Sequence, residues 1–266
     1  MTRPAADYLQ QRLEAENLTH SDIIQEDFID TYSNLVLKSL ALLRRVVADC
    51  EGREKERRCP RFVLKTDDDI YINLSVLWRE ARRSEERYLL LGALICRSKP
   101  TRDKSSKWFV PGNEYASTTY PPFLSGTAYL MSRDTVRELH KVTKYVTTFP
   151  LEDVFVTGIL AKKAGIRPQD HPGFSYRHRD LDPCSVRKTI STHKVEPREM
   201  EKVWRDARRR KEECSRGEEW APRNHWSGTC TSPKDATNIF KTHKLDRHYG
   251  QDQFIRHGQK RQHLHH

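Results

Sequence analysis

A run of β-prone residues ends in three adjacent carboxylates, and this junction is the strongest constraint that the sequence places on the fold. Residues 61–65 read RFVLK, and Asp67, Asp68 and Asp69 follow after one threonine. A short apolar run of this kind is typical of a buried strand, so the aspartates are expected at its C-terminal end. Like charges this close repel one another unless a cation lies among them. The junction therefore predicts either a binding site or an unusually acidic turn.

The pattern on both sides of the triplet alternates between strand-like and helix-like segments. Expected strands cover residues 22–30, 61–65, 88–95 and 125–132, and expected helices cover residues 31–50, 73–87, 133–146 and 152–165. Asp30 or Thr31 is the expected N-cap of the first helix, and Gly165 is expected at the end of the last one. Strands that alternate with helices predict an α/β fold, in which ligands bind beyond the C-terminal ends of the strands.

Organisation and charge divide the chain into three parts. We expect a lead-in over residues 1–20, a globular domain over residues 21–205 and a basic, partly disordered tail over residues 206–266, because the apolar pattern decays after about Trp204. The formal net charge is +11. A basic chain of this kind could bind nucleic acid, but it has neither an RNA-binding signature nor zinc-finger spacing. The interpretation favoured here is a solvated tail and no nucleic-acid partner.

The six cysteines contain no C-x-x-C pair, which argues against zinc-ribbon and thioredoxin-like sites. Cys50 and Cys59 flank a short charged loop and form the best local candidate for a disulfide. Free, half-buried thiols are the alternative interpretation of these two residues. No run approaches the roughly 20 apolar residues that a membrane span needs.

Residues 97–122 form a long loop-like stretch that contains four aromatic residues. A structureless loop of this length inside a globular region is usually either functional or disordered. Its aromatic residues, which argue against disorder, are Trp108, Phe109, Tyr115 and Tyr120.

The acidic groups each have a chemical and a structural interpretation. Asp-x-Asp after a strand suits a hard divalent cation such as Mg²⁺ or Mn²⁺, whereas the alternative is acidic charge at the start of the helix that begins near Asn73. Glu152-Asp153 is either charge at a helix start or a source of a general base. His193 is either a third metal ligand or an ordinary exposed histidine.

Five blocks, taken together and in order, resemble the family of β-1,3-galactosyltransferases and β-1,3-N-acetylglucosaminyltransferases, which also includes the Fringe proteins. The blocks are DIIQEDFIDTYSNLVLKS, RFVLKTDDDIYIN, KWFVPGNEYASTTYPPFLSGTAYLMS, LEDVFVTGILAKKAGI and the segment from Cys184 through His193 to Pro197. They cover about residues 20–205. Each block alone is weak evidence, but their order makes the resemblance strong.

The resemblance implies a GT-A-like, Rossmann-related fold with a mixed sheet flanked by helices. It also implies Mn²⁺ and a UDP-linked donor, UDP-galactose or UDP-N-acetylglucosamine. By position, Asp69 would bind the metal with Asp67 and His193. Lys65, Asp67 and Asp68 would contact the donor.

The same resemblance makes Asp153 the catalytic base that activates the 3-hydroxyl of an acceptor glycan on a glycoprotein or glycolipid. Glu152, Trp108, Tyr120 and Gly126 would line the acceptor and sugar pocket. The implied reaction is an inverting β-1,3 transfer at the lumenal side of the Golgi membrane.

The chain also departs from the family's pattern. It begins close to the first block, so we expect the family's membrane anchor and first strand to be absent from it. Leu124 stands where many members have a cysteine, which leaves the partners of Cys96 and Cys184 open. Two competing interpretations remain: an inactive remnant or basic binding module, and a metal-assisted hydrolase that uses the same carboxylates.

Overall fold

The central element is a mixed four-stranded sheet. The computed structural model describes residues 3–51, 59–84, 87–182, 184–209 and 230. The strands lie in the order β1 (Phe62–Thr66), β4 (Phe123–Ser132), β3 (Leu90–Ile95) and β5 (Gln169–Asp170). β4 is antiparallel to both β1 and β3, whereas β5 is parallel to β3. The predicted α/β class with a mixed sheet is confirmed.

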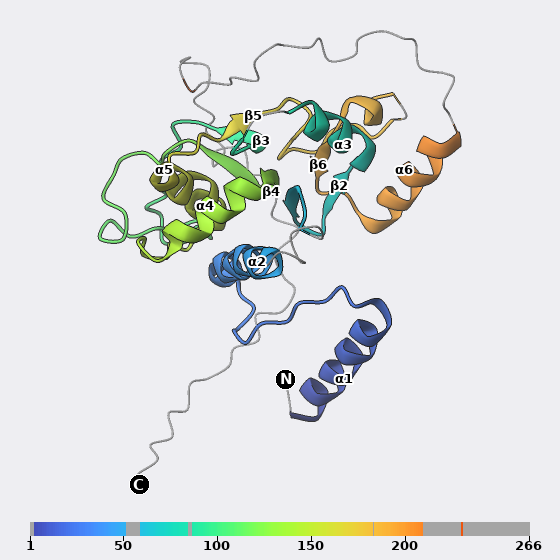
Figure 1. Ribbon diagram of the computed structural model, residues 1–266, viewed down its shortest axis with the longest axis horizontal. Coiled ribbons are helices and arrows are strands. Elements are labelled where there is room, and N and C mark those ends of the chain that lie inside the picture. The colour runs from blue at the N-terminus through green and yellow to red at the C-terminus, as the bar shows by residue number, and fades with distance from the viewer. Residues whose placement is uncertain (1–2, 52–58, 85–86, 183, 210–229, 231–266) are drawn as a thin grey trace.

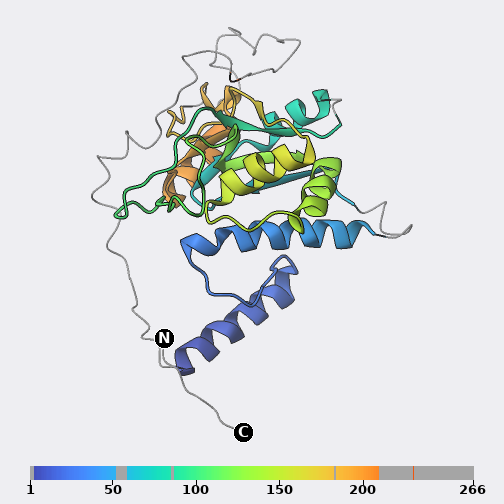
Figure 2. The same ribbon diagram turned by 90° about the vertical axis from the view of Figure 1, so that its left-hand side faces the viewer.

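Helices cover both faces of this sheet (Figures 1 and 2). One face packs against α2 (Leu35–Cys50), α4 (Arg133–Thr143) and a continuous helix made of the π-helix η3 (Val154–Leu160) and α5 (Ala161–Ala164). The other face packs against α3 (Leu74–Arg83). This arrangement explains why the strands read as nearly continuous apolar runs, since both of their faces are buried.

Side chains of β4 show the two faces directly. Tyr129 and Met131 join the core that contains α2 and α4, while Ala128 and Leu130 join the core that contains α3. Successive residues of a strand point to opposite faces, so a one-residue slip would exchange these two sets.

A second, two-stranded sheet extends beyond the C-terminal end of β1. It pairs β2 (Ile70–Ile72) with β6 (Ser191–His193) in antiparallel register, with Ile70 opposite His193. The three aspartates therefore lie at the junction of the two sheets. Asn73 follows β2 and caps α3, since its Oδ1 accepts from the Val76 N–H at 3.2 Å. The aspartates do not provide this cap, so the acidic-cap interpretation of the triplet is wrong.

Most predicted elements are confirmed, including the helix that ends at Gly165. This residue has φ +72°, in the left-handed region that favours glycine after a helix. The predicted strand over residues 22–30 is wrong: the segment forms no ladder, and Ile24 and Ile29 are 58% and 77% exposed. Local alternation alone does not make a strand when no neighbouring strand is available.

The expected N-cap of the first helix is also wrong. A single 3₁₀ turn, η1 (Tyr32–Asn34), precedes α2, and neither end of it has a side-chain cap. Asp30 instead forms an ion pair with Lys38 at 2.9 Å.

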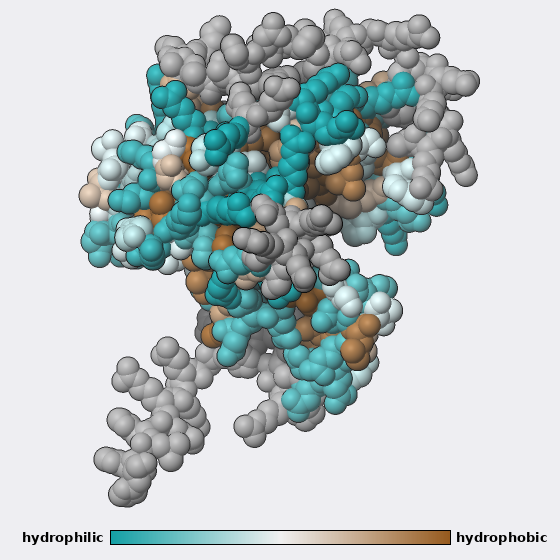
Figure 3. Space-filling view, viewed as in Figure 1, coloured by the Kyte–Doolittle hydropathy of each residue, from teal (hydrophilic) through white to brown (hydrophobic). Residues whose placement is uncertain are grey.

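Two helices at the ends of the described chain were not expected from the sequence. α1 (Arg3–His20) projects away from the body below α2, and hydrophobic atoms show among hydrophilic ones over it in Figure 3. Its exposed apolar residues are Tyr8, Leu9 and Leu18. α6 (Pro197–Arg209) continues past Trp204, so the expected boundary between residues 205 and 206 falls inside a helix. Most of the expected basic tail lies outside the described residues.

Two disulfides join cysteines that both lie among the described residues. The predicted Cys50–Cys59 bond is confirmed, and a second bond joins Cys96, directly after β3, to Cys230. Cys184 is disulfide-bonded as well. Free thiols are thus excluded for these five residues. Within the described part of the chain, no helix is both long enough and apolar enough to cross a bilayer.

Candidate active site

The two sheets bring Asp69 and His193 together. The antiparallel pairing of β2 with β6 places Ile70 opposite His193, and the Val195 N–H donates to the Asp69 carbonyl at 2.9 Å. As a result, Asp69 Oδ2 lies 3.2 Å from His193 Nε2. Two residues that are far apart in the sequence therefore form one pair. The family resemblance assigned both of them to a metal site, and that role stays a prediction.

The ring of His193 is oriented by the backbone. Its Nδ1 lies 3.0 Å from the Tyr176 carbonyl, which can only accept, so Nδ1 carries the proton and donates. In the neutral ring, Nε2 then presents a lone pair to the Asp69 carboxylate. Two facing acceptors need a proton or a cation between them. Histidine ligands of metals commonly donate their other ring N–H to a carbonyl in this way.

The pair fits a hard divalent cation whose remaining ligands come from the substrate. Two neighbouring ligands of an octahedral ion lie about 3 Å apart, because each lies about 2.1 Å from the ion. Mg²⁺-type sites often use one or two protein ligands together with substrate phosphates. No group of three acidic, histidine or cysteine side chains in the described regions could hold a metal ion. Asp67, the third predicted ligand, bonds to Lys65, and Asp68 is exposed.

Asp153 lies at the start of the π-helix, against the middle of β4. Its Oδ1 accepts from the Val154 N–H at 2.8 Å, and its Oδ2 accepts from the Gly126 N–H at 3.3 Å. Burial, and then the neighbouring charge of Glu152, raise the pKa of Asp153 to about 6. A carboxylate with such a pKa suits a general base near neutral pH.

An irregularity in β4 delivers Gly126 to this carboxylate. The register with β3 shifts between Gly92 and Leu94, whose partners on β4 are Tyr129 and Leu124. The residues between them bulge out of the ladder, as is common beside active sites. A Cβ on Gly126 would lie 3.2 Å from the Asp153 Cβ and 3.3 Å from Glu152 Oε2, so the close approach needs glycine.

Lys65 and Glu152 lie next to Asp153. The Lys65 ammonium is 2.5 Å from both Asp67 Oδ1 and the Gly126 carbonyl, and 3.8 Å from Glu152 Oε2. Burial lowers the pKa of Lys65, but the carboxylates of Glu152 and Asp67 outweigh burial and raise it above its ordinary value. Glu152 is only 7% exposed, which leaves it little room to contact a ligand.

Aromatic residues form one rim of the site. The Trp108 indole N–H donates to the Tyr32 hydroxyl at 2.9 Å, and the Lys107 ammonium lies over both rings. Burial and the charge of Asp153 raise the pKa of Tyr32 to about 12. The family resemblance implied a site role for Trp108 but none for Tyr32, because no local pattern reveals a contact between residues 76 positions apart.

Tyr120 lies inside rather than at the surface. It is 3% exposed and packs against the rings of Tyr115, Phe123 and Phe149. Its hydroxyl has no hydrogen-bond partner among the residues that the structure describes. Burial raises its pKa, and the charge of Asp153 adds to this.

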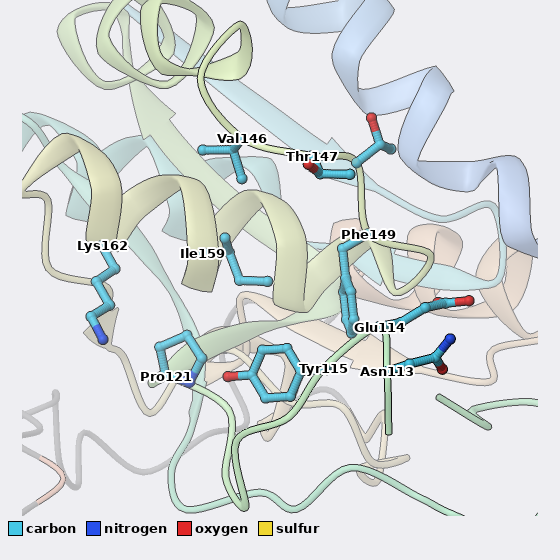
Figure 4. Close-up of a pocket in the computed structure, with 10 residues that line it drawn as sticks. Asn113, Glu114, Tyr115, Pro121, Val146, Thr147, Phe149, Ile159 and Lys162 are labelled. Atoms are coloured by element: carbon cyan, nitrogen blue, oxygen red, sulfur yellow. The ribbon is translucent and has the colours of Figure 1, made fainter. Parts of the chain in front are cut away.

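A surface cavity of about 850 Å³ lies beyond this aromatic cluster (Figure 4). Tyr115 and Phe149 form part of its wall, together with Ile159 and Lys162. The residues predicted for catalysis or metal binding do not line it. This cavity is therefore separate from the acidic groups.

Comparison with known proteins gives one family. The model of the family described as "Galactosyltransferase" matches residues 2–172. Human "Beta-1,3-galactosyltransferase 1" is 35% identical over 202 residues, which are 74% of this chain and 59% of that protein. The chain thus spans less than two thirds of the length of this relative.

Two N-acetylglucosaminyltransferases are similar to a comparable degree. Human "N-acetyllactosaminide beta-1,3-N-acetylglucosaminyltransferase 4" is 37% identical over 200 residues, which are 73% of this chain and 51% of that protein. A mouse "Acetylgalactosaminyl-O-glycosyl-glycoprotein beta-1,3-N-acetylglucosaminyltransferase" is 34% identical over 202 residues, 73% of this chain and 50% of that protein.

Proposed function

The chain belongs to the galactosyltransferase family, and on this premise we propose that it is an inverting glycosyltransferase. It would move galactose or N-acetylglucosamine from a UDP-sugar to the 3-hydroxyl of an acceptor glycan in β-1,3 linkage. The acceptor would be carried by a glycoprotein or glycolipid. The observation that supports this most is the position of Asp153, a half-buried carboxylate whose pKa of about 6 leaves it ionised at neutral pH.

In the proposed reaction, Asp153 takes the proton from the acceptor 3-hydroxyl. The acceptor oxygen attacks the anomeric carbon from the face opposite the diphosphate. The bond between that carbon and the phosphate oxygen breaks, and UDP leaves with the electron pair. One base is sufficient because no covalent enzyme intermediate forms. The configuration at the anomeric carbon is inverted.

Asp69 and His193 would hold Mn²⁺ for this reaction, with the donor diphosphate completing its ligands. When bound, the ion offsets the negative charge that grows on the leaving diphosphate. The Tyr176 carbonyl keeps the His193 ring in the orientation that presents Nε2.

We place the reaction in the lumen of the Golgi apparatus. The disulfides Cys50–Cys59 and Cys96–Cys230 support an oxidising compartment, because such bonds are rare in the cytosol.

A transfer assay tests the proposal. The chain is incubated with Mn²⁺, with UDP-galactose or UDP-N-acetylglucosamine, and with a panel of glycans that end in different sugars. The linkage of the product is then read by NMR. A β-1,3-linked product supports the proposal. Release of free sugar that does not depend on acceptor would favour a hydrolase, and calorimetry that shows no binding of UDP with Mn²⁺ would favour an inactive remnant.

A further inference from the structure

The Lys65 ammonium is surrounded by acceptor groups of the protein itself. A lysine ammonium carries three N–H donors and no acceptor. In this site the nitrogen contacts Asp67 Oδ1, the Gly126 carbonyl and the Glu152 carboxylate, and the side chain is 17% exposed. Two of the three donors therefore have a hydrogen-bond acceptor within the protein, and the Glu152 carboxylate adds an opposite charge at 3.8 Å.

Glu152 is held in place from two further elements. Its Oε1 accepts from the Ser39 hydroxyl of α2 and from the Tyr129 hydroxyl of β4, both at 2.6 Å. Its Oε2 remains for Lys65. A buried carboxylate is tolerated only when charge and hydrogen bonds compensate for lost water. Ser39, Tyr129 and Lys65 supply that compensation, and no acceptor glycan is needed for it.

Gly126 connects this internal ion pair to Asp153. Its carbonyl accepts from Lys65, and its N–H donates to Asp153 Oδ2 at 3.3 Å. Since residue 126 lies in the bulge of β4, the ladder with β3 does not fix its backbone. The Lys65 ammonium donates to the Gly126 carbonyl and so fixes this backbone, while Asp153 accepts from the N–H of the same residue.

Resting on the proposed function, we propose that Lys65 is a positioning residue that acts on Asp153 through Gly126 and Glu152, with Ser39 and Tyr129 orienting Glu152. Lys65 does not touch the donor in this arrangement. It also joins the two acidic groups of the site, because Asp67 of the triplet is bonded to the same ammonium that holds the surroundings of the base.

The alternative is that Lys65 contacts the donor directly, which the family resemblance suggested. The two roles differ in which kinetic constant depends on the ammonium. A donor contact would be lost as binding affinity for UDP and Mn²⁺. A positioning contact would be lost in kcat, with donor affinity retained.

The first experiment compares Lys65→Met, Lys65→Arg and Tyr129→Phe with wild type, and uses Lys141→Met as the matched control. Lys141 forms an exposed ion pair with Glu138 on α4. We expect Lys65→Met to lower kcat by about 30-fold or more, with the calorimetric affinity for UDP and Mn²⁺ within threefold of wild type. Lys65→Arg should recover part of kcat, Tyr129→Phe should lower it by about fivefold, and Lys141→Met should change neither quantity. A tenfold loss of UDP affinity in Lys65→Met with kcat retained would overturn the inference.

A second experiment needs no activity. A double-mutant cycle of Lys65→Met and Glu152→Gln is measured by urea unfolding. We expect the two effects on the unfolding equilibrium constant to deviate from additivity by about tenfold or more, because the residues form one buried network. Additivity within twofold would refute this inference even if transfer were observed. Coupling without any transfer in wild type would refute the proposed function and retain the network. If Lys65→Met does not fold, the same cycle with Lys65→Gln in its place gives the decision.

Discussion

The candidate site has two acidic ends, one at Glu152 and Asp153 and the other at Asp69. These two ends differ in how their charges are compensated. Glu152 is enclosed and has Ser39, Tyr129 and Lys65 as partners within the protein. Asp69 has a side chain that is 49% exposed, and its carboxylate lies 3.2 Å from His193 Nε2. The charge of Glu152 is compensated by the protein alone, whereas the charge of Asp69 is compensated only when a proton or a cation lies between it and His193. The surroundings of the proposed base are therefore preorganised, whereas the proposed cation site depends on a ligand.

The largest expected effect is on the preorganised end. Asp153→Asn should lower kcat by about 10³-fold, because it removes the general base while keeping the shape of the side chain. The affinity for UDP and Mn²⁺ should remain, since the change lies at the other end. Steady-state kinetics and calorimetry on the same variant check both statements, and a retained kcat would remove Asp153 from its role.

The same variant should be more stable than wild type above neutral pH. The pKa of Asp153 is raised to about 6 in the folded chain, so its contribution to stability is present below its unfolded pKa and is lost as pH rises through about 6. At pH 7.5 the ionised side chain should cost about 1–3 kcal/mol of folding free energy. Urea unfolding of wild type and Asp153→Asn at pH 7.5 and pH 4 measures this difference, which should vanish at the lower pH.

A smaller effect is expected at the ligand-dependent end. Asp69→Ala should weaken the binding of UDP in the presence of Mn²⁺ by about 10²-fold, since it removes one of the two protein ligands. The melting temperature without ligand should change little, because the side chain is half exposed. Asp7→Ala, at an exposed position of α1, is the matched control. Unchanged Mn²⁺-dependent binding in Asp69→Ala would show that the cation site lies elsewhere.

The pH dependence of transfer should follow the ionisation of Asp153. With saturating donor and Mn²⁺, kcat/KM for the acceptor should rise with pH, with a midpoint near 6, and should fall about tenfold per pH unit well below it. A parallel titration of UDP binding separates the base from the cation site. A flat profile between pH 5 and pH 8 would contradict the assignment of the base.

The smallest expected effect concerns the bulge. Gly126→Ala places a methyl group 3.2 Å from the Asp153 Cβ and 3.3 Å from Glu152 Oε2, so neighbouring atoms must shift by a few tenths of an ångström. We expect kcat to fall by up to about tenfold, because small displacements of a catalytic group already slow a reaction. Gly112→Ala is a suitable control, since a Cβ there meets nothing within 4 Å.

What the sequence could predict follows from how local each signal is. The strand that ends in the aspartates, the helix that ends at Gly165 and the disulfide Cys50–Cys59 all lie within short stretches, and the structure confirms them. The motif order also indicated that Asp69 and His193 belong to one site. The strand expected at residues 22–30 failed because alternation within a segment does not supply a neighbouring strand.

The hydrogen-bond network around Glu152 could not be predicted from the sequence. Ser39 contacts Glu152 across 113 positions, and Tyr129 contacts it across 23. A serine on a helix and a tyrosine on a strand are also ordinary core residues by pattern. Only the packing of α2 on the face of the sheet to which Tyr129 points brings the two hydroxyl groups to one carboxylate oxygen.

The bond between Cys96 and Cys230 has a practical consequence for how this protein is produced and handled. It connects the end of β3 to a residue 134 positions later, well beyond the last described helix. Shortening the chain after α6 would look harmless from the ribbon but would leave Cys96 with an unpaired thiol beside the long aromatic loop. Reduction in the bacterial cytoplasm, or by a thiol reductant added to an assay buffer, would break the same disulfide in the intact chain. Protein for the kinetic, calorimetric and unfolding experiments should therefore be produced by secretion and kept free of reductant.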